Sequence, residues 1–342
     1  MFLNPFIEIR TVKSGNINEY FLMDYLNRKK YSIDKNLFLF ICQLSEKQEF
    51  ETLNSNNNEI VSLLIKKKIL LTDKDDKLIS LMKMKERWSQ FNWEESFKYH
   101  MSTLDYPFEG NLDTASNIMK NYGEIEKDNL RDKKYLDTKY SLMDVKKFEK
   151  GKLNYETFQN MNVTKEKLLL LLSFAFGFVK SGVPSWSGDR IYHRTTPSGG
   201  SRQPTQGYLY VIDIPGIKSG WYYINGNTLK LEQVDTEDEF DLNKLVIINS
   251  NYKINPKCII VLTSLFEKNM YRYREPRTFR TIHIDVGHII GVVESLASKM
   301  NIIAATQYGL ENEYIEKVLD LNFLDEGYQS TIVLGTRNEE GK

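Results

Sequence analysis

The apolar residues of the first 85 positions gather in three short periodic segments, "EYFLMDYL", "KNLFLFICQL" and "NEIVSLLIKKKILLTDKDDKLISL". Their spacing predicts a helix in each of the first two segments. In the third it predicts a helix from an N-cap at Asn58 to Lys68, then a strand, an acidic turn and a second strand. This order is typical of a winged helix-turn-helix, which binds DNA in some proteins and clamps a peptide in others. Residues 1–85 are therefore expected to form a small winged-helix-like domain, with a peptide-binding or structural role favoured because "IKKK" is the only basic cluster nearby.

Residues 86–150 are expected to connect this domain to the rest of the chain. The segment begins with "ERWSQFNWEESFKYHMST", and a charged region follows it. From Glu124 to Lys150, acidic and basic residues mix with few apolar ones. That composition is typical of a solvated helix or a mobile linker.

The apolar run "LLLLLSFAFGFV" predicts a buried helix over about residues 164–180, and it is too short to span a bilayer. A second long apolar helix is expected to begin near Asp285. Asn225 and Gly226 form the favoured pair for a tight hairpin turn. Because strands alternate with long helices, residues 151–342 predict an α+β domain around one sheet. The predicted strands are "GYLYVIDI", "WYYING", "TLKLEQV", "KCIIVLTSLF" and "STIVLGTRN".

The chain of 342 residues carries 46 basic and 46 acidic side chains, so its formal net charge is zero. A neutral chain lacks the electrostatic footprint of a general nucleic-acid binder, so no nucleic-acid partner is expected. Cys42 and Cys258 are the only cysteines, which excludes a paired-cysteine zinc site and argues against a disulfide framework. The N-terminus has no basic segment followed by an apolar run. A cytoplasmic protein with no secretory signal and no membrane segment is therefore expected.

The loop "HRTTPSGGSRQPTQ" stands directly before a predicted buried strand. Its arginines offer planar forks that suit a phosphate, its hydroxyls add donors, and its Gly-Gly pair lets backbone N–H groups approach an anion. The alternative is a polar surface loop with a Gly-Gly turn. The loop matches neither a Walker motif nor the dinucleotide fingerprint, because a strand follows the glycines instead of preceding them. The candidate anion-binding residues are Arg194, Thr195, Thr196, Ser198, Gly199, Gly200 and Arg202.

A second cluster, "MYRYREPRTFRTIHIDVGH", holds four arginines and three aromatic residues before a predicted helix. Alone, this composition would also fit an RNA-binding patch. Asp285 is expected to cap the helix. A metal site is not expected, because no third ligand accompanies His283 and His288.

These segments together resemble the SagB-type, McbC-like branch of the nitroreductase superfamily, whose FMN enzymes act on ribosomally made peptides. "RTTPSGGSRQPTQGYLYVIDI" is similar to the family's Arg-x-x-Pro-Ser-Gly-Gly loop and the strand after it. "IDVGHIIGVVESLASKMNI" resembles its Asp-x-Gly-His helix, and "RWSQFNWEESFKYH" resembles a Trp-to-Tyr-His segment. The N-terminal domain resembles the winged-helix clamp found ahead of this fold. The resemblance implies a nitroreductase-like mixed sheet flanked by helices.

The resemblance also implies a homodimer with one FMN at each subunit interface. The seven loop residues would then hold the phosphate and ribityl oxygens of FMN. Arg337, in "LGTRN", stands where the superfamily often places another basic phosphate ligand. NAD(P)H is the expected reductant, and a precursor peptide is the expected partner, its leader held by the N-terminal domain.

One departure from the family bears on the reaction. Azoline-oxidising members carry a Lys-Tyr pair where this chain has Arg272 and Tyr273, with one inserted residue. Azoline oxidation needs a base, and arginine stays protonated in proteins. The pair suits the reverse direction, with Tyr273 as proton donor and Arg272 as a polarising cation. The resemblance then implies hydrogenation of dehydroalanine or dehydrobutyrine to D-amino acids in a lanthipeptide, a reaction that occurs in this family. Azoline dehydrogenation, a generic nitro- or quinone reductase and a non-catalytic peptide-binding partner stay open as alternatives.

Overall fold

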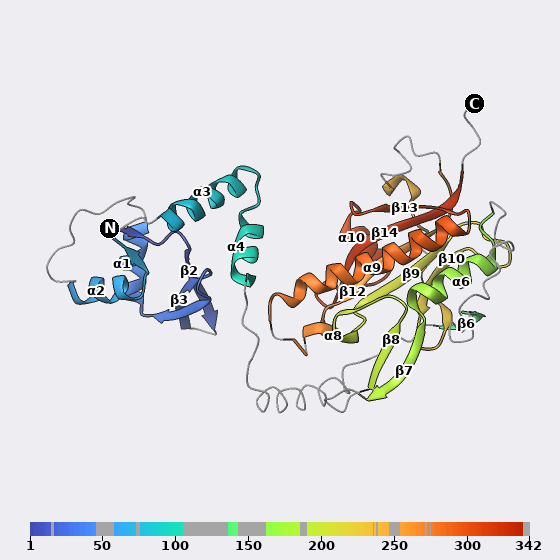
Figure 1. Ribbon diagram of the computed structural model, residues 1–342, viewed down its shortest axis with the longest axis horizontal. Coiled ribbons are helices and arrows are strands. Elements are labelled where there is room, and N and C mark those ends of the chain that lie inside the picture. The colour runs from blue at the N-terminus through green and yellow to red at the C-terminus, as the bar shows by residue number, and fades with distance from the viewer. Residues whose placement is uncertain are drawn as a thin grey trace. The chain divides into compact units, whose positions relative to one another are not determined.

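The computed structural model of the chain forms two compact units, Met1–Phe108 and Glu109–Lys342 (Figure 1). The first unit includes α3 (Asp76–Gln90) and α4 (Glu94–Thr103), of which α4 lies wholly in the residues 86–150 that were expected to connect the domains. The residues that the structure describes are 1–14, 17–45, 58–72, 76–104, 136–142, 162–184, 190–234, 236, 239–245, 254–270, 272–273 and 275–337.

The N-terminal unit contains a three-stranded antiparallel sheet in the order β2-β3-β4 and a small β1–β5 pair. Helices follow the three-stranded sheet in the chain. The elements are β1 (Phe2–Leu3), β2 (Ile7–Ser14), β3 (Ile17–Asp24), β4 (Lys29–Ile33), α1 (Lys35–Ser45), α2 (Asn58–Lys66), β5 (Leu70–Leu71), α3 (Asp76–Gln90) and α4 (Glu94–Thr103).

Two predictions for this unit are wrong. The segment "EYFLMDYL" lies mostly in β3 and is not a helix, because it is the central strand and a short apolar run does not distinguish a helix from a buried strand. The segment "KLISL" begins α3 and is not a strand. The helix expected from Asn58 and the strand after it are present as α2 and β5. A β-ribbon after the last helix, which would define the winged helix, is not seen among the described residues.

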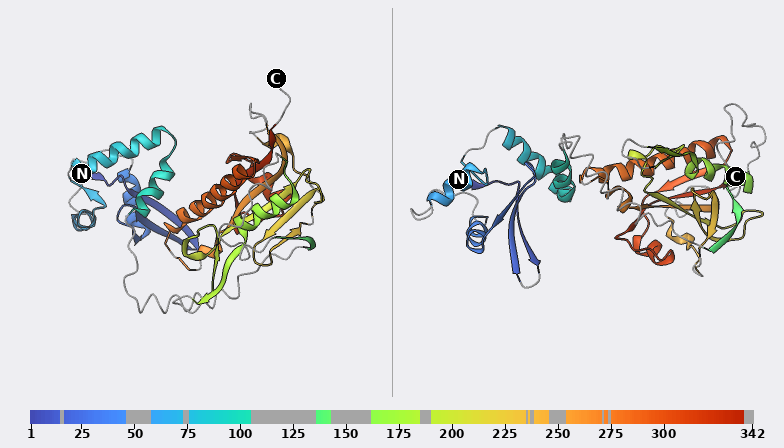
Figure 2. Two further views of the ribbon diagram at one scale, coloured as in Figure 1. Left: turned by 45° about the vertical axis from the view of Figure 1, so that its right-hand side comes forward. Right: turned by 90° about the horizontal axis from the view of Figure 1, so that it is seen from below.

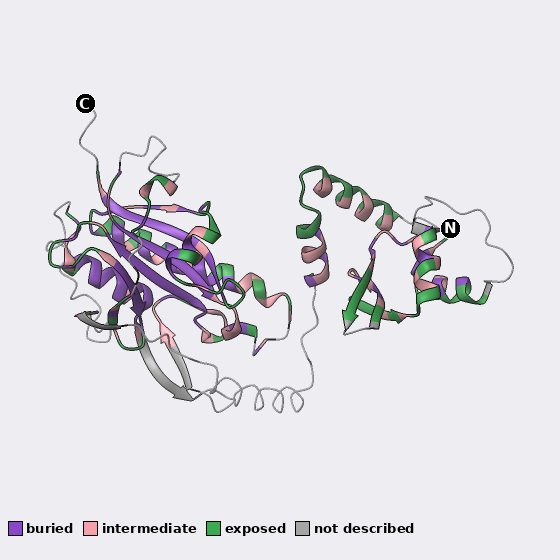
Figure 3. Ribbon diagram, turned by 180° about the vertical axis from the view of Figure 1, so that it is seen from behind, coloured by how far each residue is buried: buried purple, intermediate pink, exposed green. Residues whose placement is uncertain are grey.

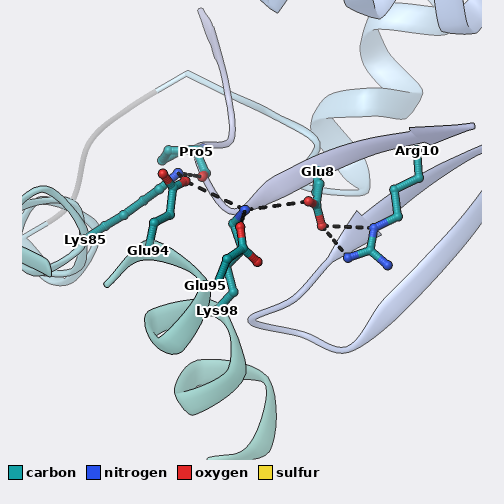
Figure 4. Close-up of polar contacts among 7 residues, drawn as sticks. All are labelled: Pro5, Glu8, Arg10, Lys85, Glu94, Glu95 and Lys98. Atoms are coloured by element: carbon teal, nitrogen blue, oxygen red, sulfur yellow. Dashed lines mark hydrogen bonds and ion pairs between the residues drawn. The ribbon is translucent and has the colours of Figure 1, made fainter. Parts of the chain in front are cut away.

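Helix α4 is fastened to the sheet of the N-terminal unit by apolar and polar contacts. Phe97 is fully buried against Phe6. The ammonium of Lys98 lies 3.6 Å from a carboxylate oxygen of Glu8 on β2 and 2.7 Å from one of Glu95 (Figure 4). From α3, Lys85 donates to the Pro5 carbonyl oxygen, 3.0 Å away. These contacts explain why α3 and α4 belong to this unit.

The C-terminal unit is built on a seven-stranded sheet in the order β13-β14-β12-β9-β10-β11-β6. Each neighbouring pair is antiparallel, so the expectation of a mixed sheet is wrong. The elements are β6 (Leu136–Ser141), α6 (Lys165–Phe176), β7 (Phe178–Pro184), β8 (Arg190–Arg194), η4 (Gly199–Ser201), β9 (Thr205–Val211), β10 (Gly220–Asn225), β11 (Lys230–Gln233), η5 (Leu242–Lys244), β12 (Ile254–Leu265), α8 (Glu267–Met270), α9 (Thr278–Lys299), β13 (Ile303–Gln307), α10 (Asn312–Val318) and β14 (Glu326–Arg337).

Each face of this sheet has its own core. On one face, α6 and α9 cover an aliphatic cluster that includes Leu209 and Ile260. On the other, α10 and the segment 239–245 cover an aromatic cluster that includes Tyr210 and Trp221. Figure 2 shows α9 and α10 on opposite sides of the sheet, and Figure 3 shows its central strands buried. The α+β class is thus confirmed.

Most predicted elements of this unit are confirmed: the strands, the hairpin and the buried helix α6. The tight Asn-Gly turn is not formed, because Asn225 pairs with Lys230 and the hairpin loop is residues 226–229. The helix expected to begin near Asp285 begins earlier, at Thr278. Within the charged region, β6 pairs with β11 as an edge strand, whereas residues 124–135 and 143–150 lie outside the described residues. No described helix is both long and apolar enough to cross a membrane.

Candidate functional site

The loop between β8 and β9 lies at one end of the sheet. Its last residue precedes Thr205, which is the register partner of Ser264 on β12. At the same end, Leu265 of β12 is the register partner of Glu326, the first residue of β14. Arg337 is the last residue of β14 and pairs with Ile254 at the opposite end. Within one chain, the structure therefore does not bring Arg337 to the loop.

Arg194 ends β8 and carries its charge into the protein. Its Nη1 donates to the Thr205 carbonyl oxygen over 3.2 Å, and its guanidinium lies 5.1 Å from the Phe178 ring centroid. Its Nε is buried and has no hydrogen-bond partner among the described residues. Burial lowers the pKa of Arg194 to about 10, so the side chain is still a cation at neutral pH. The carboxylate of Asp285 offsets part of the free energy of holding this charge away from water, and a bound anion would offset more.

Two buried hydroxyls at this end of the sheet also lack partners. The side-chain oxygens of Thr205 and Ser264 are buried without a hydrogen bond to any described residue. As register partners on antiparallel strands they lie on the same face of the sheet. Unsatisfied buried donors are rare in folded proteins and suggest a missing ligand or water.

The two threonines of the loop have a different role from the one expected. Thr195 donates its hydroxyl to the Phe174 carbonyl oxygen, and Thr196 donates to that of Ala175 over 3.1 Å. These carbonyls belong to the last turn of α6, where no intrahelical N–H is available to them. The threonines therefore cap α6, and their hydroxyl protons do not face a ligand.

Ser198 and Gly199 are bonded to helix α9. The Ser198 hydroxyl donates to Oδ2 of Asp285 over 2.6 Å, and the Gly199 N–H donates to Oδ1 over 3.1 Å. The Ser198 oxygen also accepts from the Gln203 N–H over 2.9 Å. Because α9 begins at Thr278, Asp285 does not cap that helix as expected. It caps the short helix η4 of the loop instead.

Gly200 and Tyr273 meet in the structure. Gly200 has a φ of 59°, a left-handed conformation that glycine adopts without strain. A Cβ at this position would clash with the Tyr273 hydroxyl. Arg202 is half-buried and donates from Nε to the Gly200 carbonyl oxygen over 3.2 Å. Of the two catalytic candidates, Tyr273 therefore contacts the loop, and Arg272 is buried next to it in the chain.

The two histidines of the second cluster point to different partners. Nδ1 of His288 donates to the Pro197 carbonyl oxygen over 3.1 Å, whereas His283 contacts the Gln329 side chain at 2.9 Å. Among the described residues, no three His, Cys, Asp or Glu side chains form a group that could hold a metal ion.

No family model matches the chain. Two curated proteins are similar to it in sequence. The Trifolitoxin-processing protein TfxB of Rhizobium leguminosarum bv. trifolii is 28% identical over 176 residues, which cover 49% of this chain and 46% of TfxB. The "Putative nitroreductase MJ1384" of Methanocaldococcus jannaschii is 24% identical over 129 residues, 37% of this chain and 64% of that protein. The chain thus spans about half of TfxB and less than two thirds of the second relative.

Among solved structures, one chain of the E. coli microcin synthetase McbBCD complex with truncated pro-MccB17 bound is similar to this protein. The match covers 84% of this chain and 99% of that chain. The sequence identity is 16% and the TM-score is 0.42. A TM-score of this size does not by itself define the fold.

The residues that could hold an anionic cofactor are fewer than the sequence predicts. Arg194, Arg202 and the exposed Gly200 turn are the parts of the loop that suit a phosphate or a ribityl chain. Thr195, Thr196, Ser198 and Gly199 use their predicted donors within the protein. Sequence reasoning missed the contact of Asp285 with the loop. A signal existed, because Thr281, Asp285 and His288 stand at helical spacing and so place three polar groups on one face of the helix.

Proposed function

We propose that the C-terminal unit is an FMN-dependent oxidoreductase that acts on a ribosomally synthesised peptide. The observation that carries the proposal is the partly buried Arg194 side chain, whose buried Nε lacks a hydrogen-bond partner among the described residues. The buried hydroxyls of Thr205 and Ser264, at the same end of the sheet, are also unsatisfied. The similarity to a toxin-processing protein and to a nitroreductase supports it. The unsatisfied donors fit the oxygens of a flavin mononucleotide, which are anionic or polar acceptors.

In this proposal the protein binds and orients the cofactor and the peptide substrate. FMN, when bound, supplies the capacity to take up or deliver a hydride. Arg194 and Arg202 would hold the phosphate and ribityl oxygens. The left-handed Gly200 leaves the Tyr273 hydroxyl room against the loop. Tyr273 would therefore stand next to the cofactor, where it could give a proton to a substrate.

For the direction of the reaction we favour hydrogenation of dehydroalanine or dehydrobutyrine in a lanthipeptide. Arg272 is buried, and arginine stays protonated even when enclosed, so it can polarise a carbonyl but cannot act as the base that azoline oxidation needs. Tyr273 would donate the proton to the α-carbon. Azoline dehydrogenation is the alternative, and NAD(P)H would be the reductant only for hydrogenation.

Two further parts of the proposal concern assembly. In a homodimer, Arg337 could reach FMN only from the second copy, since it lies at the far end of the sheet in its own chain. The leader of the precursor peptide would bind the N-terminal unit. An apolar hollow of about 370 Å³ supports this, with Leu71, Leu78 and Leu81 in its lining beside Lys68 and Lys77.

Purification of the full chain and its absorbance spectrum provide the first test, and a flavin spectrum is expected. Incubation with a dehydrated precursor peptide and NADPH should then add two hydrogen masses per modified residue in mass spectrometry. Loss of two hydrogens from a cyclised peptide would support azoline dehydrogenation instead. A colourless protein that takes up no added FMN but binds the leader peptide would favour the non-catalytic partner.

A further inference from the structure

We propose that Asp285 is a positioning residue that holds the loop from Ser198 to Gln203 in its ligand-binding shape before the cofactor arrives. The inference rests on the proposed function only in naming FMN as the ligand. The contact itself joins α9 to a loop that lies 87 positions earlier in the chain.

Both oxygens of the Asp285 carboxylate accept hydrogen bonds from the loop. Oδ2 accepts from the Ser198 hydroxyl at 2.6 Å, and Oδ1 accepts from the Gly199 N–H at 3.1 Å. The same Ser198 oxygen accepts from the Gln203 N–H at 2.9 Å. Asp285 therefore orients the Ser198 hydroxyl, which in turn links Ser198, the first residue of the turn, to Gln203, the last.

The turn needs such a restraint because its backbone is strained. Ser201 has a φ of 55° and Gln203 a φ of 53°. Residues other than glycine in the left-handed region are uncommon, and they keep this conformation only where the surroundings enforce it. Without the carboxylate, we expect the turn to relax and Arg202 to lose its position.

Helix α9 is a rigid support for this contact. Asp285 is 4% exposed between buried apolar neighbours such as Ile282 and Ile289. One turn before it, Thr281 packs against Gly199, and one turn after it His288 donates to the Pro197 carbonyl oxygen over 3.1 Å. Three polar side chains on one helix face thus contact the beginning of the loop.

A purely structural role fits the carboxylate poorly. Burial raises the pKa of Asp285, while Ser198, Gly199, His288 and Arg194 lower it to a smaller extent. The net rise means that the ionised form is disfavoured by folding, so the carboxylate charge is not retained for stability. The two carboxylate oxygens accept from two separate donors, Ser198 and Gly199. An amide in the same place has one accepting oxygen, and its NH2 group would face the other donor.

The variant Asp285→Asn tests the inference in the full chain. It keeps the shape of the side chain and removes one acceptor. We expect FMN affinity, measured by quenching of flavin fluorescence, to fall about tenfold to a hundredfold, with little change in the melting temperature. In FMN-free protein, hydrogen exchange of the loop amides should become faster. As pH falls, the affinity of the wild type should decrease more steeply than that of the variant, because protonation of the FMN phosphate affects both and protonation of Asp285 affects only the wild type.

Glu294→Gln is the matched control, because Glu294 is an exposed acid on the same helix that accepts from the Thr306 hydroxyl and does not contact the loop. It should leave affinity and exchange unchanged. If Asp285→Asn does not fold, Ser198→Ala removes the other half of the same hydrogen bond and should have the same two effects. Unchanged loop exchange, or faster exchange with unchanged FMN affinity, overturns the inference. A wild type that binds no FMN overturns the proposed function, and the exchange measurement still decides whether Asp285 holds the loop.

Discussion

The ion-pair network at Lys98 in the N-terminal unit and the buried charges of the C-terminal unit are stabilised in different ways. In the N-terminal unit, Lys98 lies within 4 Å of three carboxylates, and the side chain of its nearest partner, Glu95, is 85% exposed. In the C-terminal unit, Lys167 and Asp285 are only 1% and 4% exposed. Their bonds go to neutral groups: Lys167 donates to the Met300 carbonyl oxygen over 2.7 Å, and Asp285 accepts from Ser198 and Gly199.

Charges of the first kind are largely hydrated at the surface, whereas those of the second kind hold buried segments together. Exposed ion pairs are screened by water and each contributes little to stability. An enclosed charge is disfavoured by desolvation, so its presence indicates a contact or a ligand that compensates for it. The N-terminal unit also holds an enclosed charge, Asp24, which is 2% exposed, but both of its oxygens accept from Asn27 in the same turn. Arg194 of the C-terminal unit keeps an Nε that is unsatisfied among the described residues, so this unit is the better candidate for the site.

Replacement of Arg194 should have the largest effect. Arg194→Ala removes the cation with the unsatisfied Nε, and we expect FMN affinity to fall about a hundredfold or more. Arg194→Lys keeps the charge but not the planar fork, so its loss should be intermediate. Fluorescence titration measures both. Lys257→Ala, at an exposed pair with Asp213, is the control for a lost positive charge. Equal affinity in Arg194→Ala and wild type would remove Arg194 from the site.

Lys167 comes next, with an effect on stability. Lys167→Met keeps most of the side-chain volume but removes the donor to the Met300 carbonyl oxygen at the end of α9. Leaving a buried carbonyl without this donor should lower the free energy of unfolding by about 1–3 kcal/mol. Urea denaturation followed through the fluorescence of the C-terminal unit checks this. A variant as stable as wild type would mean that relief of lysine desolvation, which lowers the pKa of Lys167, balances the lost bond.

Asp285 should give a smaller, pH-dependent effect on stability. Its pKa is raised in the folded chain relative to an ordinary value of about 3.9. The folded state thus binds the proton more tightly, so the free energy of unfolding should decrease as pH rises through this window and level off above it. The difference between wild type and Asp285→Asn in melting temperature across acidic pH isolates this dependence. A difference that stays constant with pH would contradict it.

The smallest effect is expected at the surface network of the N-terminal unit. Lys98→Ala should lower stability by about 0.2–1 kcal/mol, and added salt should reduce the difference. Thermal melts at low and high salt measure it. A loss of stability as large as that of Lys167→Met would contradict the expected difference between exposed and enclosed charges.

Local patterns in the sequence predicted local structure well. The β10–β11 hairpin, the buried helix and strand β9 are set by turn residues and short-range periodicity. The predicted start of α9 near Asp285 is too late, because the arginines and Pro276 near its true start interrupt the apolar pattern that indicates a helix. Segment "EYFLMDYL" was misassigned because a strand with neighbours on both sides carries a continuous apolar run.

The candidate site was predicted only in part, because its decisive partners are distant in sequence. The loop and both arginines were recognised from residue type. That Ser198 and Gly199 donate to Asp285, and that two threonines cap α6, depends on contacts between segments that no local pattern records. Residue type gives the capacity to bind an anion, but the tertiary partner decides whether a donor is still available.

The separation of Arg194 and Arg337 has a genetic consequence. Strand β14 has 12 residues, and at about 3.3 Å per residue its ends lie too far apart for one mononucleotide to touch both. If Arg337 serves a cofactor at all, it serves that of another chain. A cell that expresses one copy damaged at Arg194 together with another damaged at Arg337 would then assemble some intact sites, although neither allele has one alone.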